Sequence, residues 1–162
     1  AFVRWEFATP VAGAVLRINP FDEPAVRTRQ ELTQKFLKNF EETGRLEQLP
    51  PHSPPFGKSL LKPTPGEFVA LLAFLPPREE IRREFQLLRE GIGRKYGAAT
   101  TLGFGPRYLH SIGQYYKGGP NRGHFLFFTG QDQELPIPGR KYGFSILKQA
   151  QALGDMEALR AM

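Results

Sequence analysis

The hydrophobic positions divide the chain into a helical start, a proline-rich middle and an alternating pattern of strands and helices. Between Phe2 and Ile18 apolar residues recur on nearly every side of a helical projection, which predicts a well-buried helix. From Pro24 to Gly44 the apolar residues share one face, and Asp22 is placed to cap this second helix. Residues 1–43 are therefore predicted to form a helical pair.

Prolines dominate the next segment, residues 44–66, which is predicted to be a connector because it can sustain neither a helix nor a central strand. Residues 67–162 then read as one α/β unit with the order βαβαβα. Right-handed crossovers would make its strands parallel and place helices on both faces, in three layers. The expected elements are strands at 68–75, 98–104 and 123–130, a helix at 78–96, a short helix before the last strand, and a helix from 144 onward.

Composition and charge narrow the class of protein. A chain of 162 residues suits one domain, and no apolar run is long enough to cross a membrane. The absence of cysteine excludes disulfides and thiolate metal sites, so a cytoplasmic protein is expected. The net charge of +6 favours anionic partners without choosing among nucleic acid, lipid headgroups and phosphorylated metabolites. The start without methionine and the end inside a helical pattern suggest a piece of a longer chain.

The run "LGFGPRYLHSIGQ" after the second strand holds the candidate chemistry. Ligands of parallel α/β sheets bind beyond the carboxyl ends of the strands, and glycines there let backbone amides approach an anion, with Arg107 as a clamp. The segment is equally consistent with a tight turn before a helix. His110 and Gln114 lie four residues apart, so a helix would present an imidazole and an amide on one face, although a lone histidine is more often structural.

The other polar clusters give weaker evidence for a functional site. The segment "KGGPNRG" (residues 117–123) could be a second anion site or a cationic turn, and it precedes a strand, at the opposite end from "GFGP". His52 and His124 lack neighbouring ligands, so no metal is expected. The cations of residues 78–84 alternate with glutamates, as on a solvated helix face, which argues against nucleic acid.

Several motifs resemble a known family. The segments "FVRWEFATPVAGAVLRINPFDEPAV", "ATTLGFGPRYLHSIGQYYKGGPN", "LPIPG" and "LKQAQALGDMEALR" are similar to the C-terminal part of bifunctional transaldolase/glucose-6-phosphate isomerase proteins. "NPFDEP" resembles the signature of bacterial phosphoglucose isomerases, and "LHSIGQ" resembles their histidine-bearing segment. The resemblance implies a sugar-isomerase (SIS-type) fold and the interconversion of glucose 6-phosphate and fructose 6-phosphate without a cofactor.

The resemblance also implies residue roles. His110 matches the histidine that helps open the sugar ring, and Ser111, Gln114 and Arg107 would contact the sugar phosphate. Two positions depart from the pattern: Glu23 replaces the glutamine of the signature, and Gln30 occupies the place of its lysine.

The family's catalytic glutamate has no counterpart in the sequence and is expected upstream of Ala1, in domains of the same chain. The 162 residues alone would then be nearly inactive. The alternative is a non-catalytic sugar-phosphate-binding or structural module, which the departures at Glu23 and Gln30 would permit. A nucleic-acid surface is the weakest possibility.

Overall fold

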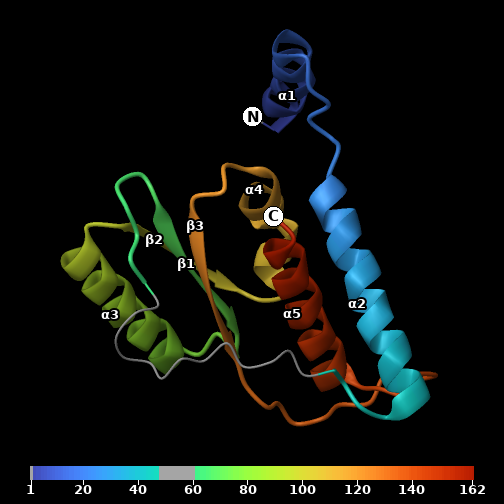
Figure 1. Cartoon of the computed structure of the whole chain (residues 1–162). Helices are drawn as coiled ribbons and strands as arrows, with labels where there is room; N and C mark the ends of the chain where they lie inside the picture. The colour runs from blue at the N-terminus through green and yellow to red at the C-terminus, as the bar shows by residue number, and fades with distance from the viewer. Residues whose placement is uncertain (1, 48–60) are drawn as a thin grey trace.

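The computed structural model describes residues 2–47 and 61–162 and confirms the predicted α/β fold (Figure 1). Each predicted element is present, with boundaries within two residues of those expected. The elements in chain order are α1 (Phe2–Leu16), α2 (Pro24–Thr43), β1 (Phe68–Phe74), α3 (Glu79–Tyr96), β2 (Ala99–Phe104), the 3-10 helix η1 (Arg107–His110), α4 (Gly113–Gly118), β3 (Gly123–Thr129) and α5 (Phe144–Arg160).

The sheet has three parallel strands in the order β2-β1-β3. Phe68 of β1 pairs with Ala99 on one side and Gly123 on the other, so all three strands start at the same edge. The central strand is covered on both faces, because every residue from Val69 to Phe74 is at most 1% exposed. This confirms the reading of "FVALLAFL" as a buried parallel strand.

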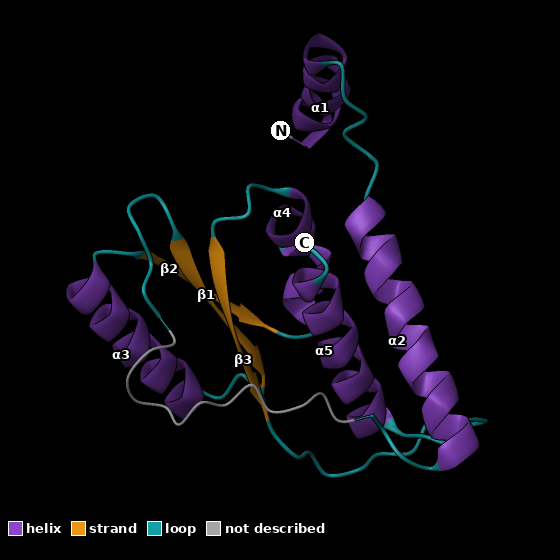
Figure 2. Ribbon diagram, viewed as in Figure 1, coloured by secondary structure: helices purple, strands orange, loops and turns teal. Residues whose placement is uncertain are grey.

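Helices cover both faces of the sheet, in three layers (Figure 2). Alternate residues of a strand point to opposite faces. Val69, Leu71 and Ala73 pack against α3, whereas Ala70, Leu72 and Phe74 pack against η1, α4 and α5. The helix α2 lies on the outer side of α5, where its residues 36 and 37 contact Ala150, so it completes the body without joining the sheet.

Backbone conformation explains where the two long helices before the second strand end. Gly44 and Gly97 follow α2 and α3 with positive φ values of 70° and 64°, a conformation that glycine adopts without steric cost. At the other end, α2 begins at Pro24 with Glu23 in the N-cap position, and no side chain caps it. The prediction that Asp22 caps this helix is therefore wrong, and the fixed φ of proline starts the helix instead.

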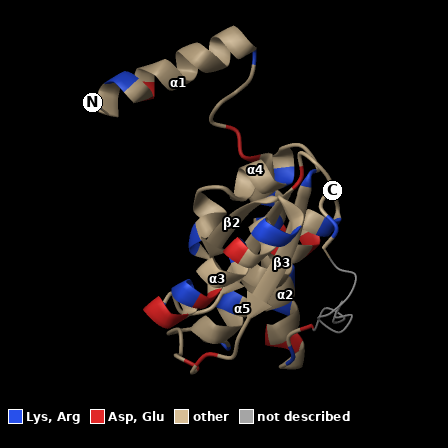
Figure 3. Ribbon diagram, turned by 90° about the vertical axis from the view of Figure 1, so that its left-hand side faces the viewer, with Lys and Arg blue, Asp and Glu red and all other residues tan. Residues whose placement is uncertain are grey.

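The helix α1 forms as predicted but is not buried. Its large side chains are exposed, Trp5 to 75% and Phe7 to 71%, and the helix stands clear of the α/β body (Figures 1 and 3). The prediction of a well-buried helix is wrong for the described residues. Apolar residues on every side of a helix favour burial, but none of the described elements packs around α1. None of the described helices is long and apolar enough to cross a bilayer.

The connector is only partly described. Residues 44–47 and 61–66 lie outside helices and strands, as predicted, whereas residues 48–60, including His52, fall outside the described ranges.

Two glycines inside helices provide a matched stability test. A Cβ at Gly154 of α5 would lie 2.5 Å from Oγ1 of Thr33 and 3.1 Å from the carbonyl oxygen of Arg29, so α2 and α5 approach too closely for a methyl group. A Cβ at Gly91 of α3 would have nothing within 4 Å. We expect Gly154→Ala to lower the free energy of unfolding by about 1–3 kcal/mol and Gly91→Ala to raise it by up to about 1 kcal/mol. Urea denaturation measures both, and equal shifts would contradict the close contact.

Candidate functional site

A cavity of about 650 Å³ lies between α2, η1 and α5, and His110 opens into it. The histidine is the last residue of η1 and is exposed. Gln30 of α2 lines the same cavity, so the fold brings together two positions that are far apart in the sequence. The other lining residues are Arg27, Arg29, Glu31, Thr33, Gln34, Leu147 and Gln151.

The wall from α2 gives the cavity its charge. Arg27 and Arg29 contribute positive charge and Glu31 contributes a carboxylate, while residues 30 and 34 add side-chain amides. An imidazole ring has one nitrogen that can accept a proton and one that can donate it, so His110 can act as a general acid or base toward a molecule in this space. The cavity therefore combines one acid–base group with hydrogen-bond donors suited to an oxygen-rich anionic ligand.

A buried polar network holds the short helix that ends at His110. The hydroxyl group of Tyr108, in the same short helix, donates a hydrogen bond to Oδ2 of Asp155, which is fully buried in α5. Nζ of Lys117 lies 2.5 Å from Oδ1 of this carboxylate as an ion pair and also donates to the carbonyl oxygen of Gly113 at 3.0 Å. The network ties η1 and α4 to α5, so it fixes the segment that ends at His110.

Burial sets the protonation of the tyrosines in this region. Burial, the charge of Asp155 and the hydrogen bond to it together raise the pKa of Tyr108 far above its ordinary range. Burial also raises the pKa of Tyr116, whose hydroxyl group lies 2.8 Å from Oγ1 of Thr101. Both phenols are therefore neutral hydrogen-bonding groups and not bases.

The "GFGP" turn is built for close packing more than for an anion. A Cβ at Gly103 would lie 2.9 Å from the Tyr108 side chain, and one at Gly105 would lie 2.6 Å from the ring of Phe74. The amide of Gly105 donates to the carbonyl oxygen of Ala73 at 2.9 Å. The amides of residues 109, 111 and 112 also donate to carbonyl groups within the turn. Of the two readings of this segment, the geometry favours the tight turn.

The remaining predicted contacts lie outside the residues that line the His110 cavity. Arg107 is exposed at the start of η1, and the hydroxyl group of Ser111 donates to the carbonyl oxygen of Tyr108 at 3.2 Å. Oε1 of Gln114 accepts a hydrogen bond of 3.2 Å from the amide of Ala25, so this side chain holds the start of α2. Glu23 is exposed beside that point.

The segment 117–123 lies at the amino-terminal edge of the sheet, as predicted, because Gly123 begins β3 beside Phe68. On the same strand, Nε2 of His124 lies 2.9 Å from Oε2 of Glu67, and this hydrogen bond lowers the pKa of the glutamate. Within residues 2–47 and 61–162, no group of three or more His, Asp and Glu side chains could hold a metal ion.

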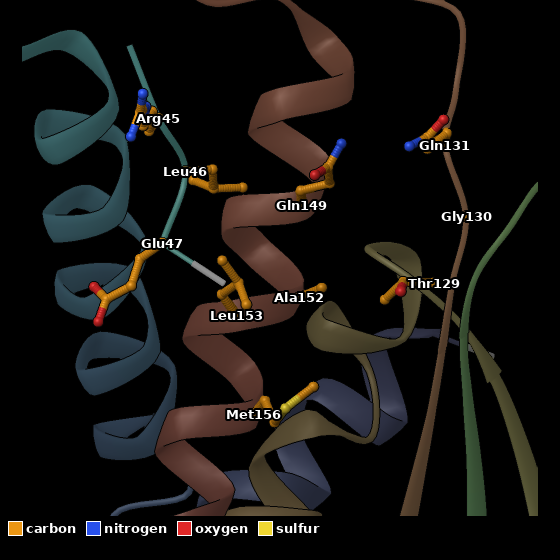
Figure 4. A pocket seen from close by; sticks show the side chains of 10 residues that line it. All are labelled: Arg45, Leu46, Glu47, Thr129, Gly130, Gln131, Gln149, Ala152, Leu153 and Met156. Atoms are coloured by element: carbon orange, nitrogen blue, oxygen red, sulfur yellow. The ribbon is translucent and has the colours of Figure 1, made fainter. Parts of the chain in front are cut away.

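A second cavity, of about 890 Å³, adjoins the carboxyl end of β3 on the α5 side of the sheet (Figure 4). Gln149 of α5 and Gln131 face one another across it, with Thr129, Ala152 and Met156 nearby. Its charged lining residues are Arg45 and Glu47, both exposed, and none of the histidines in the described ranges lines it. It offers hydrogen bonds and apolar contact but no acid–base pair comparable with the His110 cavity.

Sequence reasoning missed the α2 wall and the buried network. Nothing in the sequence distinguishes Arg29 from the other arginines, and Lys117 was predicted only as part of a second anion site or a cationic turn. A signal for Asp155 was present, because a carboxylate amid the small apolar residues of α5 requires a buried partner, but the sequence does not say which cation supplies it.

Comparisons with protein-family models, curated proteins and solved structures found no match to this chain.

Proposed function

We propose that the chain is the C-terminal, SIS-like part of a transaldolase/glucose-6-phosphate isomerase and contributes a half-site for interconverting glucose 6-phosphate and fructose 6-phosphate. The observation that carries the proposal is the shared cavity of His110 and Gln30. The resemblance assigns these two positions to the histidine and the lysine of one catalytic site, and both line one cavity although they lie far apart in the sequence.

The roles follow from the chemistry of the side chains. As the bond between the anomeric carbon and the ring oxygen breaks, His110 would donate a proton to the ring oxygen while the anomeric hydroxyl releases its proton to water, and both transfers reverse as the ring closes. Gln30 can hydrogen-bond to a sugar oxygen but cannot donate a proton as an ammonium group does. The proton that moves between C1 and C2 needs a carboxylate, which we assign to a segment upstream of residue 1, so the 162 residues alone should turn over almost no substrate.

The surface of α1 supports the assignment to a longer chain. A helix that is apolar on all sides is characteristic of a position inside a larger core. The exposed side chains of Phe2, Trp5, Phe7, Val11 and Val15 would be covered by upstream domains of the same protein.

Removing the histidine tests the proposal. In the longer chain we expect His110→Gln to lower kcat for fructose 6-phosphate by about 10²- to 10⁴-fold, the usual contribution of one general acid–base group. His124→Gln is the matched control, because His124 pairs with Glu67 at the other edge of the sheet and should leave kcat unchanged. Steady-state isomerase kinetics measure both variants, and full turnover by His110→Gln would refute the role of the histidine.

The identity of Gln30 favours a second candidate function, a module that binds sugar phosphate without catalysis. Calorimetric titration of fructose 6-phosphate into the longer chain separates the two candidates. Binding without measurable isomerisation supports the non-catalytic module, whereas binding with turnover supports the isomerase. Absence of binding would rule out both candidate functions.

A further inference from the structure

Arg29 is a buried arginine for which the described residues supply no compensating carboxylate. Its exposed fraction is 3%, yet none of the ion pairs among the described residues includes it. Its Nε atom is fully buried and has no hydrogen-bond partner in the described part of the chain. An unpaired buried charge is costly, so a guanidinium group in this state calls for an anion.

The charges around Arg29 do not balance. Lys117 and Asp155 form an ion pair with side chains that are 4% and 0% exposed, so these two charges compensate one another. The Tyr108 hydroxyl stays neutral, because burial and Asp155 raise its pKa, and the nearby charge of Arg29 opposes this only weakly. Among the described residues, the buried side chains of Arg29 and Lys117 are thus matched by a single buried carboxylate, which Lys117 neutralises, so the charge of Arg29 remains.

This surplus charge faces the His110 cavity. Arg29 is one of its lining residues, together with the exposed Arg27 and the exposed Glu31. The volume of about 650 Å³ holds a small oxyanion with its attached sugar. A guanidinium group binds the oxygens of a phosphate in a fork of N–H donors, and hydrogen bonds between charged groups are the strongest of their kind.

We propose that Arg29 is the anion-binding residue of this cavity and receives a phosphate group, with Arg27 as a second, solvent-exposed cation. The "GFGP" turn, whose glycines pack against Phe74 and Tyr108, does not take this role. Anion binding as such follows from Arg29 alone. Only the identification of the anion as the phosphate of a sugar rests on the proposed function.

The test is the binding of inorganic phosphate and of fructose 6-phosphate at low ionic strength, measured by calorimetry on the full chain and on Arg29→Met. Methionine keeps a long side chain and removes the charge. We expect the dissociation constants for both ligands to rise about tenfold or more, while fructose without phosphate does not bind at the site. The exposed Arg83→Met on α3, across the sheet, is the matched control for the loss of one charge and should bind like the unchanged protein.

The binding test requires that Arg29→Met folds. Because the substitution removes an unpaired buried charge, thermal unfolding should show Arg29→Met to be at least as stable as the unchanged protein. If it does not fold, the Nε–H resonance of Arg29 in the unchanged protein provides a second readout, since it should shift on adding phosphate and not on adding sodium chloride. No shift, or equal phosphate binding by Arg29→Met and the unchanged protein, would overturn the proposal.

The outcomes separate this inference from the proposed function. Phosphate binding that depends on Arg29, combined with a silent His110→Gln variant, upholds the anion site and rejects the isomerase. Isomerase activity that depends on His110 but is the same in Arg29→Met, with unchanged phosphate binding, does the reverse.

Discussion

Asp155→Asn is expected to lower the free energy of unfolding by about 3–5 kcal/mol, the usual result of removing one partner of a buried ion pair. The carboxylate is fully buried and is contacted by Nζ of Lys117 and the hydroxyl group of Tyr108. Asparagine leaves the ammonium group of Lys117 without a carboxylate partner among the described residues. The effect should therefore exceed that of losing a hydrogen bond, which is about 1 kcal/mol.

Urea denaturation monitored by circular dichroism measures the change, and two further variants establish its cause. Asp132→Asn removes a carboxylate that pairs with Lys148 at the surface, with side chains 27% and 18% exposed, and should cost less than about 1 kcal/mol. The double variant Asp155→Asn with Lys117→Met should recover part of the loss, because it removes the stranded cation. A loss below about 1 kcal/mol for Asp155→Asn alone would show that the network is dispensable.

The fold was predictable because its signals are local. The unbroken apolar run from Phe68 to Leu75 is short and bounded by glycine and proline, which is typical of a strand covered on both faces. The one-sided apolar pattern from Pro24 onward identifies α2 in the same way. These patterns show which face of an element is buried, but not which other element covers it. The sequence therefore does not predict that α2 packs on α5 and not on the sheet.

The same limit explains the error on α1. Its apolar residues on every side predict that the free energy of the helix falls when its whole surface is removed from water. They do not predict that the surrounding residues belong to these 162. Trp5 and Phe7 are exposed because the pattern specifies a need for burial and not which residues provide it.

The candidate site was half predictable. His110 could be singled out because of its motif, and the cavity beside it agrees with a ligand-facing role. The importance of Arg29 could not be seen, because one arginine among 22 basic residues is distinguished only by burial and by the absence of a partner. Both properties arise from tertiary packing, where α2 meets η1 and α5.

Phe74→Ala is the second substitution with a large expected effect, a loss of about 3–5 kcal/mol in the free energy of unfolding. The ring is 1% exposed at the carboxyl end of β1, where it meets Tyr108 edge-on with centroids 5.8 Å apart and stacks on Phe127 at 6.3 Å. Truncation leaves a cavity beneath the "GFGP" turn, which packs on this ring at Gly105. The matched control is Phe21→Ala, since that ring is 70% exposed and its loss should cost about 0.5 kcal/mol or less.

Phe74 also links the core to the site. It packs against Tyr108, which donates a hydrogen bond to Asp155 and lies in the same short helix as His110. Substitutions that share a partner are not additive, and coupling of about 0.5–3 kcal/mol is usual for residues in one network. We therefore expect Phe74→Ala and Asp155→Asn together to cost less than the sum of the single changes, because each already releases Tyr108. Urea denaturation of the four-member cycle measures the coupling, and strict additivity would mean that the aromatic core and the buried ion pair hold η1 independently.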